Sequence, residues 1–345
     1  MNQLVTRATQ DGVAVITINN PPVNALSPGV PEGLLAALEA AEKDASVRAI
    51  VIIGGGKTFI AGADIKELEL GAKGLGAGPP EFHTFLAKIE DAGKPVVMAI
   101  HGTALGGGNE VAMAGHYRVA VPGAQIGQPE VNLGIIPGAA GTQRLPRLAG
   151  VAKAVEMCAF GAPISAKEAL EAGIADRMIE GDLLAGAVAF AKEVADRPGP
   201  KTRLRDGKLL GVDPAVYARA RDTAKKTKRG QPAPLAAIDA VEAATKMPFE
   251  EGCAYEGKLF NECLFSIESK ALIHAFFGER TVVQAEPGRL GSCMSDPYRC
   301  VRLQPIHCAY YSPIRAPKCA MTLYRNEGER RFAIMAGVHT DKYPI

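Results

Sequence analysis

The chain has 345 residues, of which 47% are hydrophobic and 22% are charged, and its formal net charge is +2. This composition excludes a small disulfide-stapled scaffold and an intrinsically disordered chain, because it supplies enough apolar material for a large core and little excess charge. The near balance of 39 basic and 37 acidic residues provides no overall field that would attract nucleic acid. We therefore expect one large core with an appendage, or two domains, and no nucleic-acid partner.

Targeting and metal-binding signals are weak in this sequence. The first eleven residues lack the apolar segment of a secretory signal, and no run approaches the roughly 20 apolar residues that a membrane-spanning helix needs. The C-terminal Tyr343-Pro344-Ile345 is not a peroxisomal signal. The spacing of the seven cysteines fits neither a disulfide framework nor a zinc site. We expect a cytoplasmic protein without a metal and without membrane contact.

Strand-like and helix-like segments alternate over the first part of the chain. The predicted elements, in chain order, are a strand at 13–18, a helix at 32–45, a strand at 49–53, a helix at 83–92, a strand at 95–100, a short helix at 106–115 and a strand at 117–121. This alternation favours an α/β fold with largely covered sheets.

The later part of the chain reads differently. Glycine-rich residues 71–80 predict a mobile loop, and from about residue 185 the pattern indicates helices without strands. These helices are predicted at 187–196, 214–226, 235–246 and 249–280. Ten basic residues between 201 and 229 are interpreted as a solvated helix face in preference to a phosphate site. Prolines beyond residue 286 prevent any long helix, and no clear element is predicted there.

Two nucleotide-binding motifs are incomplete. Gly56-Lys57-Thr58 resembles the end of a phosphate-binding loop, but Val51 occupies the position of its leading glycine. The glycines at 74, 76 and 78 are followed by Pro79 and lack the strand-turn-helix context of a dinucleotide fingerprint. We predict neither a Walker-type ATP site nor an NAD site.

Three consecutive glycines follow a predicted buried strand and begin a predicted helix. Gly106, Gly107 and Gly108 would let a substrate approach the main chain, where the unpaired amides of a helix N-terminus act as donors. The pattern indicates an oxyanion or phosphate cradle. A tight turn that merely packs the helix on the sheet is an equal alternative.

Two acidic residues stand in apolar surroundings nearby. Glu110 lies in the first turn of the predicted helix, where desolvation would raise its pKa and suit proton transfer. Alternatively, it only compensates the helix dipole. Glu130 is isolated among apolar residues, and its alternative is a surface-loop acid.

Four motifs, in order along residues 5–190, resemble the crotonase, or enoyl-CoA hydratase/isomerase, family. They are Phe59-Ile60-Ala61-Gly62-Ala63-Asp64-Ile65-Lys66, His101-Gly102-Thr103-Ala104-Leu105-Gly106-Gly107-Gly108-Asn109-Glu110, Gly127-Gln128-Pro129-Glu130 and Ile136-Pro137-Gly138-Ala139-Ala140-Gly141-Thr142-Gln143-Arg144-Leu145. The helical stretch through Arg280 is similar to the N-terminal hydratase/isomerase part of multifunctional β-oxidation enzymes.

The resemblance implies an α/β fold built as a crotonase-like spiral of repeated ββα units with a C-terminal helical appendage. We expect the hydratase/isomerase core over residues 1–190, the appendage over 191–285 and an atypical tail over 286–345. No dehydrogenase fingerprint is present, and the tail resembles no part of those enzymes. We interpret the tail as disordered or as the product of a frameshift.

The resemblance also implies the chemistry. The amides of Ala63 and Gly107 would form an oxyanion hole for the thioester oxygen, Glu110 would activate water for attack at C3, and Glu130 would exchange the proton at C2. The implied reaction is hydration of 2-enoyl-CoA in fatty-acid β-oxidation, with Δ3,Δ2-enoyl-CoA isomerase as a second activity. The alternative is an impaired acyl-CoA-binding remnant that has lost its dehydrogenase domain.

Coenzyme A would enter only as part of the substrate. By the same resemblance, adenine would lie against residues 61–64, pantetheine would pass residues 23–25, and the turn at 137–138 would leave room for water and the acyl chain. The implied substrate-binding residues are Val23, Asn24, Ala25, Ala61, Gly62, Asp64, Ile65, Gly106, Pro137 and Gly138. Relatives in this family form trimers, or monomers where their own helices cover the equivalent surface, so either state is expected.

Overall fold

The protein is described by a computed structural model that covers residues 4–73, 82–197, 204–207, 209, 213–284, 301–302, 320–325 and 332–337. The chain divides into two units, residues 1–277 and 278–345. Most of the predicted loop at 71–80 and most of the predicted tail at 286–345 lie outside the described residues.

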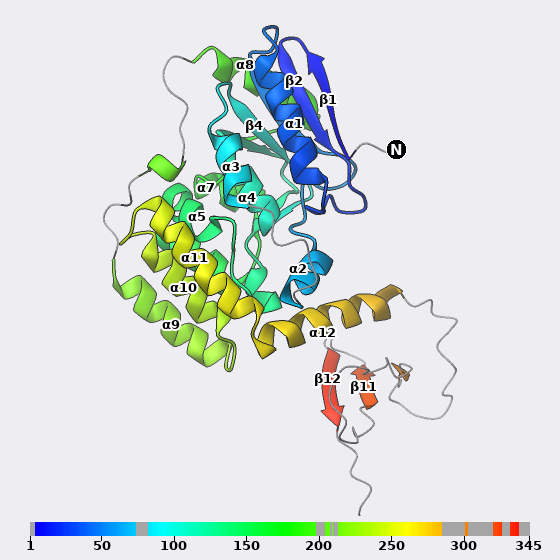
Figure 1. The fold of residues 1–345 in the computed structure, drawn as a ribbon, viewed down its shortest axis with the longest axis vertical. Coiled ribbons are helices and arrows are strands. Elements are labelled where there is room, and N and C mark those ends of the chain that lie inside the picture. Colours follow the sequence, from blue (N-terminus) through cyan, green and yellow to red (C-terminus); the bar gives the residue numbers. More distant parts are fainter. Residues whose placement is uncertain are drawn as a thin grey trace, which may run out of the picture. The chain divides into compact units, whose positions relative to one another are not determined.

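A six-stranded sheet forms the centre of the first unit (Figure 1). Its order is β1 (Val5–Gln10), β2 (Val13–Ile18), β3 (Ala49–Gly54), β4 (Val96–Ile100), β6 (Tyr117–Ala120) and β9 (Arg177–Met178). Strand β1 pairs antiparallel with β2, and every other pairing in this sheet is parallel. The predicted strands β2, β3, β4 and β6 are confirmed. The edge strand β1 escaped prediction because only one of its six residues is buried.

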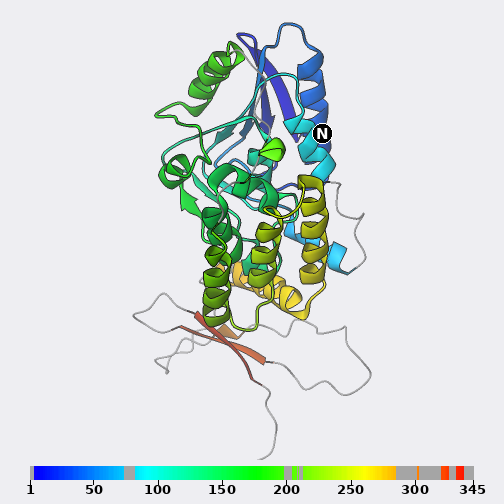
Figure 2. The same cartoon turned by 90° about the vertical axis from the view of Figure 1, so that its left-hand side faces the viewer.

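Helices cover both faces of this sheet, because nearly every residue of the central strands β2, β3 and β4 is buried although successive side chains point to opposite faces. Ile50 and Ile52 of β3 pack in one core cluster with residues of α1 (Val30–Lys43) and α3 (Phe82–Glu90). Val51, between them, packs in the opposite cluster with α8 (Leu183–Ala195). Figure 2 shows α1 and α8 on opposite sides of the strands.

Short strands that follow the long ones form a second sheet, of order β5-β7-β8. Strand β4 continues into β5 (Thr103–Leu105) and then helix α4 (Gly107–Ala114), and β6 continues into β7 (Gln125–Gly127) and the 3-10 turn η1 (Glu130–Leu133). Strand β8 (Ile164–Ser165) completes this sheet. This repetition of long strand, short strand and helical segment confirms the expected ββα spiral. It also brings α4 and η1 to the same side of the small sheet.

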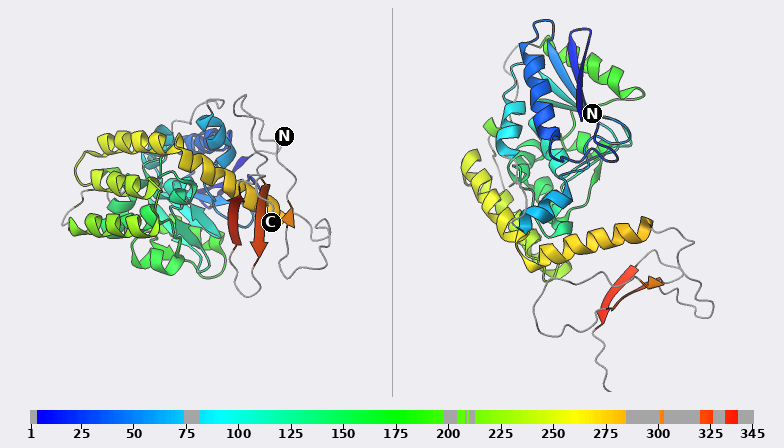
Figure 3. Two further views of the ribbon diagram at one scale, coloured as in Figure 1. Left: turned by 90° about the horizontal axis from the view of Figure 1, so that it is seen from below. Right: turned by 45° about the vertical axis from the view of Figure 1, so that its right-hand side comes forward.

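The remaining helices connect strands or follow the last strand of these two sheets. Their bounds are α2 (Ile65–Ala72), α5 (Gly141–Ala149), α6 (Val151–Phe160), α7 (Ala166–Glu171), α9 (Ala215–Thr227), α10 (Ala233–Ala243), α11 (Phe249–Leu264) and α12 (Ile267–Gln284), with a 3-10 turn η2 (Leu204–Asp206). Helix α10 packs between α9 and α11, and Figure 3 shows the three side by side. In the described part of the chain, none of the helices is both long and apolar enough to cross a bilayer.

The prediction of one helix over 249–280 is wrong, since α11 ends at Leu264 and α12 begins at Ile267. The main-chain amide of Ser269 donates to Oγ of Ser266 (3.0 Å). This serine therefore accepts a hydrogen bond in the manner of a helix N-cap, which favours a new helix start over continuation of the old one.

The second unit contains a three-stranded antiparallel sheet for which the sequence pattern had given no indication. Its strands are β10 (Val301–Arg302), β11 (Ala320–Arg325) and β12 (Phe332–Gly337).

Candidate active site

The backbone of Gly107 lies beside the amide of Ala63. Ala63 follows β3 and forms an isolated parallel bridge with Leu26, while Gly107 is the first residue of α4. A Cβ placed on Gly107 would lie 3.3 Å from Ala63 N and 3.1 Å from Leu26 Cδ1. Glycine at this position therefore keeps a small space open next to the Ala63 amide.

The amides of Ala63 and Gly107 share one property in the part of the chain that the structure describes. Among the residues that the structure describes, neither Ala63 N nor Gly107 N donates a hydrogen bond. The neighbouring amides do have acceptors, since Leu26 N donates to Gly62 O (2.9 Å) and Glu110 N donates to Gly106 O (3.0 Å). An amide pair of this kind can bind an oxygen atom that carries negative charge.

Glu110 is buried, with 4% of its surface exposed, in the first turn of α4. Its Oε1 accepts hydrogen bonds from the amides of Ala139 (2.8 Å) and Gly141 (2.9 Å). Burial raises the pKa of Glu110 to about 7, although these two amides and the charge of Arg144 oppose the shift. The carboxylate form is therefore accessible near neutral pH.

Glu130 begins η1 and reaches toward the glycine turn before α4. A Cβ on Gly106, which has φ +54°, would lie 3.0 Å from Glu130 Oε1. The Oε2 atom of Glu130 is buried and has no hydrogen-bond partner among the described residues. Burial, and then the charge of Glu110, raise the pKa of Glu130 well above its usual range.

The two carboxyls thus have different environments within one site. Glu110 receives two amide hydrogen bonds, which stabilise its charged form, whereas Glu130 carries a buried oxygen without such support. A pair of this kind can supply one carboxylate base and one carboxylic acid at the same pH. The structure therefore brings together Glu110, Glu130 and the glycine turn, which are separated along the sequence.

The predicted coenzyme A positions lie next to the Ala63 amide. Val23 is 41% exposed, but the buried side chain of Asn24 donates to Gly55 O (2.9 Å) and Thr58 O (2.8 Å). The Asn24 side chain is therefore bound to the loop at residues 55–58, and only the main chain of Asn24 can face a ligand. Val23 O accepts a hydrogen bond from Ala61 N (3.1 Å), which joins the two predicted ligand segments.

Residues 62–65 turn from the sheet into α2. Gly62 has φ +130°, a conformation that L side chains rarely adopt. Asp64 caps α2 by accepting from Lys66 N (3.0 Å), and its other carboxylate oxygen accepts from Ser27 Oγ (2.8 Å). The Asp64 carboxylate therefore supports the shape of the turn. The other two predicted ligand residues here, Ile65 and Ala25, are partly exposed.

The predicted turn at Pro137 and Gly138 lies against α11. A Cβ on Gly138 would lie 2.6 Å from Cδ2 of Phe260, and Pro137 is buried. The helical region therefore covers this part of the site with an aromatic ring.

A third buried carboxylate, Glu256 of α11, was not predicted from the sequence. Its Oε1 accepts from Ala140 N (2.6 Å), and its Oε2 accepts from the amide (2.8 Å) and hydroxyl of Thr142. A signal was available, because Glu256 lies four residues from both Gly252 and Phe260 on a helix stripe that is otherwise apolar or small. An acidic residue in such a stripe calls for a buried partner.

A buried ion pair lies next to this cluster. Arg144 of α5 contacts Glu90 of α3 at 2.7 Å, and both side chains are 2% exposed. The Arg144 guanidinium also lies over the ring of Phe249, 5.2 Å from its centroid. This pair joins α3, α5 and α11 around the carboxylates.

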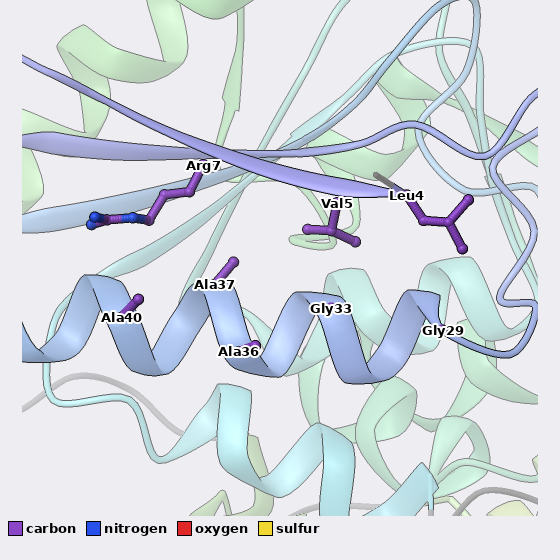
Figure 4. Close-up of a pocket in the computed structure, with 8 residues that line it drawn as sticks. All are labelled: Leu4, Val5, Arg7, Gly29, Gly33, Ala36, Ala37 and Ala40. Atoms are coloured by element: carbon purple, nitrogen blue, oxygen red, sulfur yellow. The ribbon is translucent and has the colours of Figure 1, made fainter. Parts of the chain in front are cut away.

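One surface groove is unrelated to these residues. It lies between the N-terminal strand and α1 (Figure 4), and it is lined by Leu4, Val5, Arg7, Gly29, Gly33, Ala36, Ala37 and Ala40. Its one charged lining residue, Arg7, is paired with Asp44 (3.2 Å). Within the described ranges, no group of three histidine, cysteine or acidic residues could hold a metal ion.

Comparisons with known proteins match this chain to enoyl-CoA hydratases and to multifunctional enzymes that are named peroxisomal. A family model described as enoyl-CoA hydratase/isomerase matches residues 8–205. The chain is 42% identical over 278 residues to "Peroxisomal bifunctional enzyme" of Danio rerio, which covers 78% of this chain and 37% of that protein. It is 46% identical over 202 residues to "Probable enoyl-CoA hydratase" of Bacillus subtilis (strain 168), covering 57% of this chain and 78% of the relative.

A solved structure shares the fold. The enoyl-CoA hydratase/isomerase of Pseudoalteromonas atlantica T6c has a TM-score of 0.57 and 28% identity, and the match covers 80% of this chain and 97% of that one. The chain spans less than two-fifths of the length of the peroxisomal relatives that it matches.

Proposed function

This chain belongs to the enoyl-CoA hydratase/isomerase family, and we propose that it adds water across the 2,3 double bond of 2-enoyl-CoA thioesters, as in fatty-acid β-oxidation. The observation that carries this proposal is the juxtaposition of two amides, which have no acceptor among the described residues, with two carboxyls of different environment. One part of the site suits a developing oxyanion, and the other suits proton transfer.

The amides of Ala63 and Gly107 would donate to the thioester oxygen. As water attacks C3, electrons move toward that oxygen and give it enolate character, so the two donors stabilise the transition state more than the substrate. Each such donor is typically worth about 2.7–4 kcal/mol. The lack of competing acceptors supports this role.

Glu110 and Glu130 would move the protons. The Glu110 carboxylate takes a proton from water while the water oxygen bonds to C3, and the Glu130 carboxylic acid delivers its proton to C2. The product gains one hydrogen and one hydroxyl, and transfer of a proton from Glu110 back to Glu130 restores the starting state. The raised pKa of Glu130 supports its service as the acid.

Coenzyme A would be bound as part of the substrate. We place its adenine against residues 61–64 and its pantetheine along residues 23–25, where Ala61 N bonds to Val23 O. No nicotinamide is required for hydration, because the reaction transfers no hydride.

Isomerisation from Δ3 to Δ2 is a second candidate activity. The unpartnered Oε2 of Glu130 favours it, because in the carboxylate form of Glu130 this atom can take a proton from C2 and then deliver it at C4 of the same bound chain. The activity needs no group beyond those assigned to hydration.

Crotonyl-CoA provides the test. We expect the full chain to consume the conjugated thioester, and Glu110→Gln and Glu130→Gln each to lower kcat about 10²–10⁴-fold, with circular dichroism unchanged. Binding of crotonyl-CoA in calorimetry without turnover by the unsubstituted chain would support the impaired remnant instead.

The expected cytoplasmic location stays a prediction, and relatives of this chain are named peroxisomal and glyoxysomal. The expectation of a trimer or a monomer stays a prediction as well.

A further inference from the structure

Four successive main-chain amides are divided between two carboxylates. Within residues 139–142, the first and third amides donate to Glu110 (2.8 and 2.9 Å). The second and fourth donate to Glu256 (2.6 and 2.8 Å). Each carboxylate thus accepts from two of the four amides, and all four buried donors are paired because both carboxylates are present.

The conformation of this segment requires support. Ala140 has φ +63°, a left-handed conformation that is unfavourable for a residue with a Cβ and persists only where its surroundings hold it. The amide of Ala140 is one of the two that Glu256 binds. The hydroxyl of Thr142 adds a third hydrogen bond to the same carboxylate.

Helix α11 follows this segment along its length. Gly252, at one end of the stripe, would carry a Cβ 2.2 Å from Gln143 Oε1, and Phe260, at the other end, contacts Gly138. Glu256 lies midway between them, so its carboxyl reaches the centre of the segment. The helix can approach so closely at Gly252 only because that residue has no side chain.

We propose that Glu256 is a positioning residue for the hydration reaction, holding residues 139–142 so that two of their amides fix the Glu110 carboxylate. The inference rests on the proposed function. It extends the active site to helix α11, beyond residues 8–205 that match the family model. The appendage thereby supplies part of the machinery that orients the catalytic base.

The protonation of Glu110 gives a second readout. The titratable and charged groups that interact within the cluster are Glu110 of α4, Glu130 of η1, Arg144 of α5, Cys158 of α6 and Cys253 of α11. Burial, and then the charge of Glu110, raise the pKa of Glu256 to about 8. The amides of Ala139 and Gly141 lower the pKa of Glu110. Removing the carboxyl at 256 loosens these two amides, so Glu110 should keep its proton to higher pH.

The test compares two substitutions on the same helix. Glu256→Gln keeps the side-chain shape but replaces one acceptor oxygen with an NH₂ group, which cannot accept from the main-chain amides. Glu251→Gln changes an exposed acid of α11 and serves as the control. With crotonyl-CoA, we expect Glu256→Gln to lower kcat at least tenfold, to leave KM within twofold and to move the acid limb of the pH profile to higher pH. The control should match the unsubstituted chain.

Hydrogen exchange measures positioning without relying on turnover. In Glu256→Gln we expect faster exchange at all four amides of residues 139–142, including the two that donate to Glu110. Unchanged exchange at those two amides, or an unchanged kcat and pH profile in the folded variant, overturns the proposal. If the unsubstituted chain lacks hydratase activity, the proposed function fails, and the exchange result still decides the positioning role.

Thr142→Val decides the question if Glu256→Gln does not fold. It removes one donor to Glu256 and keeps the shape of the side chain. We expect a two- to fivefold loss of kcat, a KM within twofold and faster exchange at residues 139–142. Normal kcat and normal exchange in this variant overturn the proposal.

Discussion

The two sides of the candidate site use main-chain amides in opposite ways. On the oxyanion side, the amides of Ala63 and Gly107 have no acceptor in the described part of the chain. On the carboxylate side, each amide of residues 139–142 donates to a buried glutamate. This difference fits the proposed roles, in which the donors for a substrate oxygen stay free and the donors that orient the catalytic base are satisfied within the protein.

A substitution at the Ala63 and Gly107 amides should reduce activity with little loss of stability. Gly107→Ala places a Cβ 3.3 Å from Ala63 N, in the space where a thioester oxygen would bind. We expect kcat for crotonyl-CoA to fall about 100-fold, the effect of losing one oxyanion donor, while urea unfolding changes by less than about 1 kcal/mol. A variant with full activity would contradict the assignment of this amide pair.

A substitution that disturbs the packing of α11 against residues 139–143 should lower the stability of the protein. Gly252→Ala forces a Cβ to within 2.2 Å of Gln143 Oε1, whose side chain is also held by its hydrogen bond to Ala240 O (2.9 Å). We expect overpacking to lower the free energy of unfolding in urea by about 1–3 kcal/mol.

Gly257→Ala is the matched control on the same helix. A Cβ there meets nothing within 4 Å, so we expect alanine to stabilise the helix by about 0.5–1 kcal/mol. Equal effects of the two substitutions would show that close packing at Gly252 is unimportant.

The pH profile sharpens the difference between the two carboxyls. With a pKa of about 7, Glu110 gains a proton as the pH falls, so kcat/KM should decrease on the acid side, roughly tenfold for each pH unit below 7. Glu130 must be protonated, and its raised pKa places its loss of activity on the alkaline side. Rates measured between pH 5.5 and 9.5 should therefore be bell-shaped, and a profile without an acid limb would argue against Glu110 as the base.

Local patterns made much of the fold predictable. The buried strands β2, β3 and β4 are apolar runs with β-branched residues, and α1 carries a helical apolar stripe. The ββα spiral followed from a resemblance in short, continuous motifs. Glu110 and Glu130 stood out because an acid among apolar neighbours is costly to bury without a reason.

Other features depend on distant contacts. The first turn of α12 is held by Ser269, whose hydroxyl donates to Leu133 O (3.0 Å), 136 residues away, in a region where helical periodicity continues on both sides. Asn24 has a sequence position suited to a ligand path, but its side chain bonds to carbonyl groups more than thirty residues away. Neither outcome is encoded in spacing alone.

The amino-acid sequence by itself determined the alternating α/β core, the glycine turn before α4 and the two isolated acids, because each follows from the residues within one or two turns of the chain. Only the tertiary structure decided which amides stay free and how Glu256, 146 residues after Glu110 in the numbering, joins the same cluster. Hydrogen-bond satisfaction and desolvation depend on what packs nearby in space, and no local pattern specifies that.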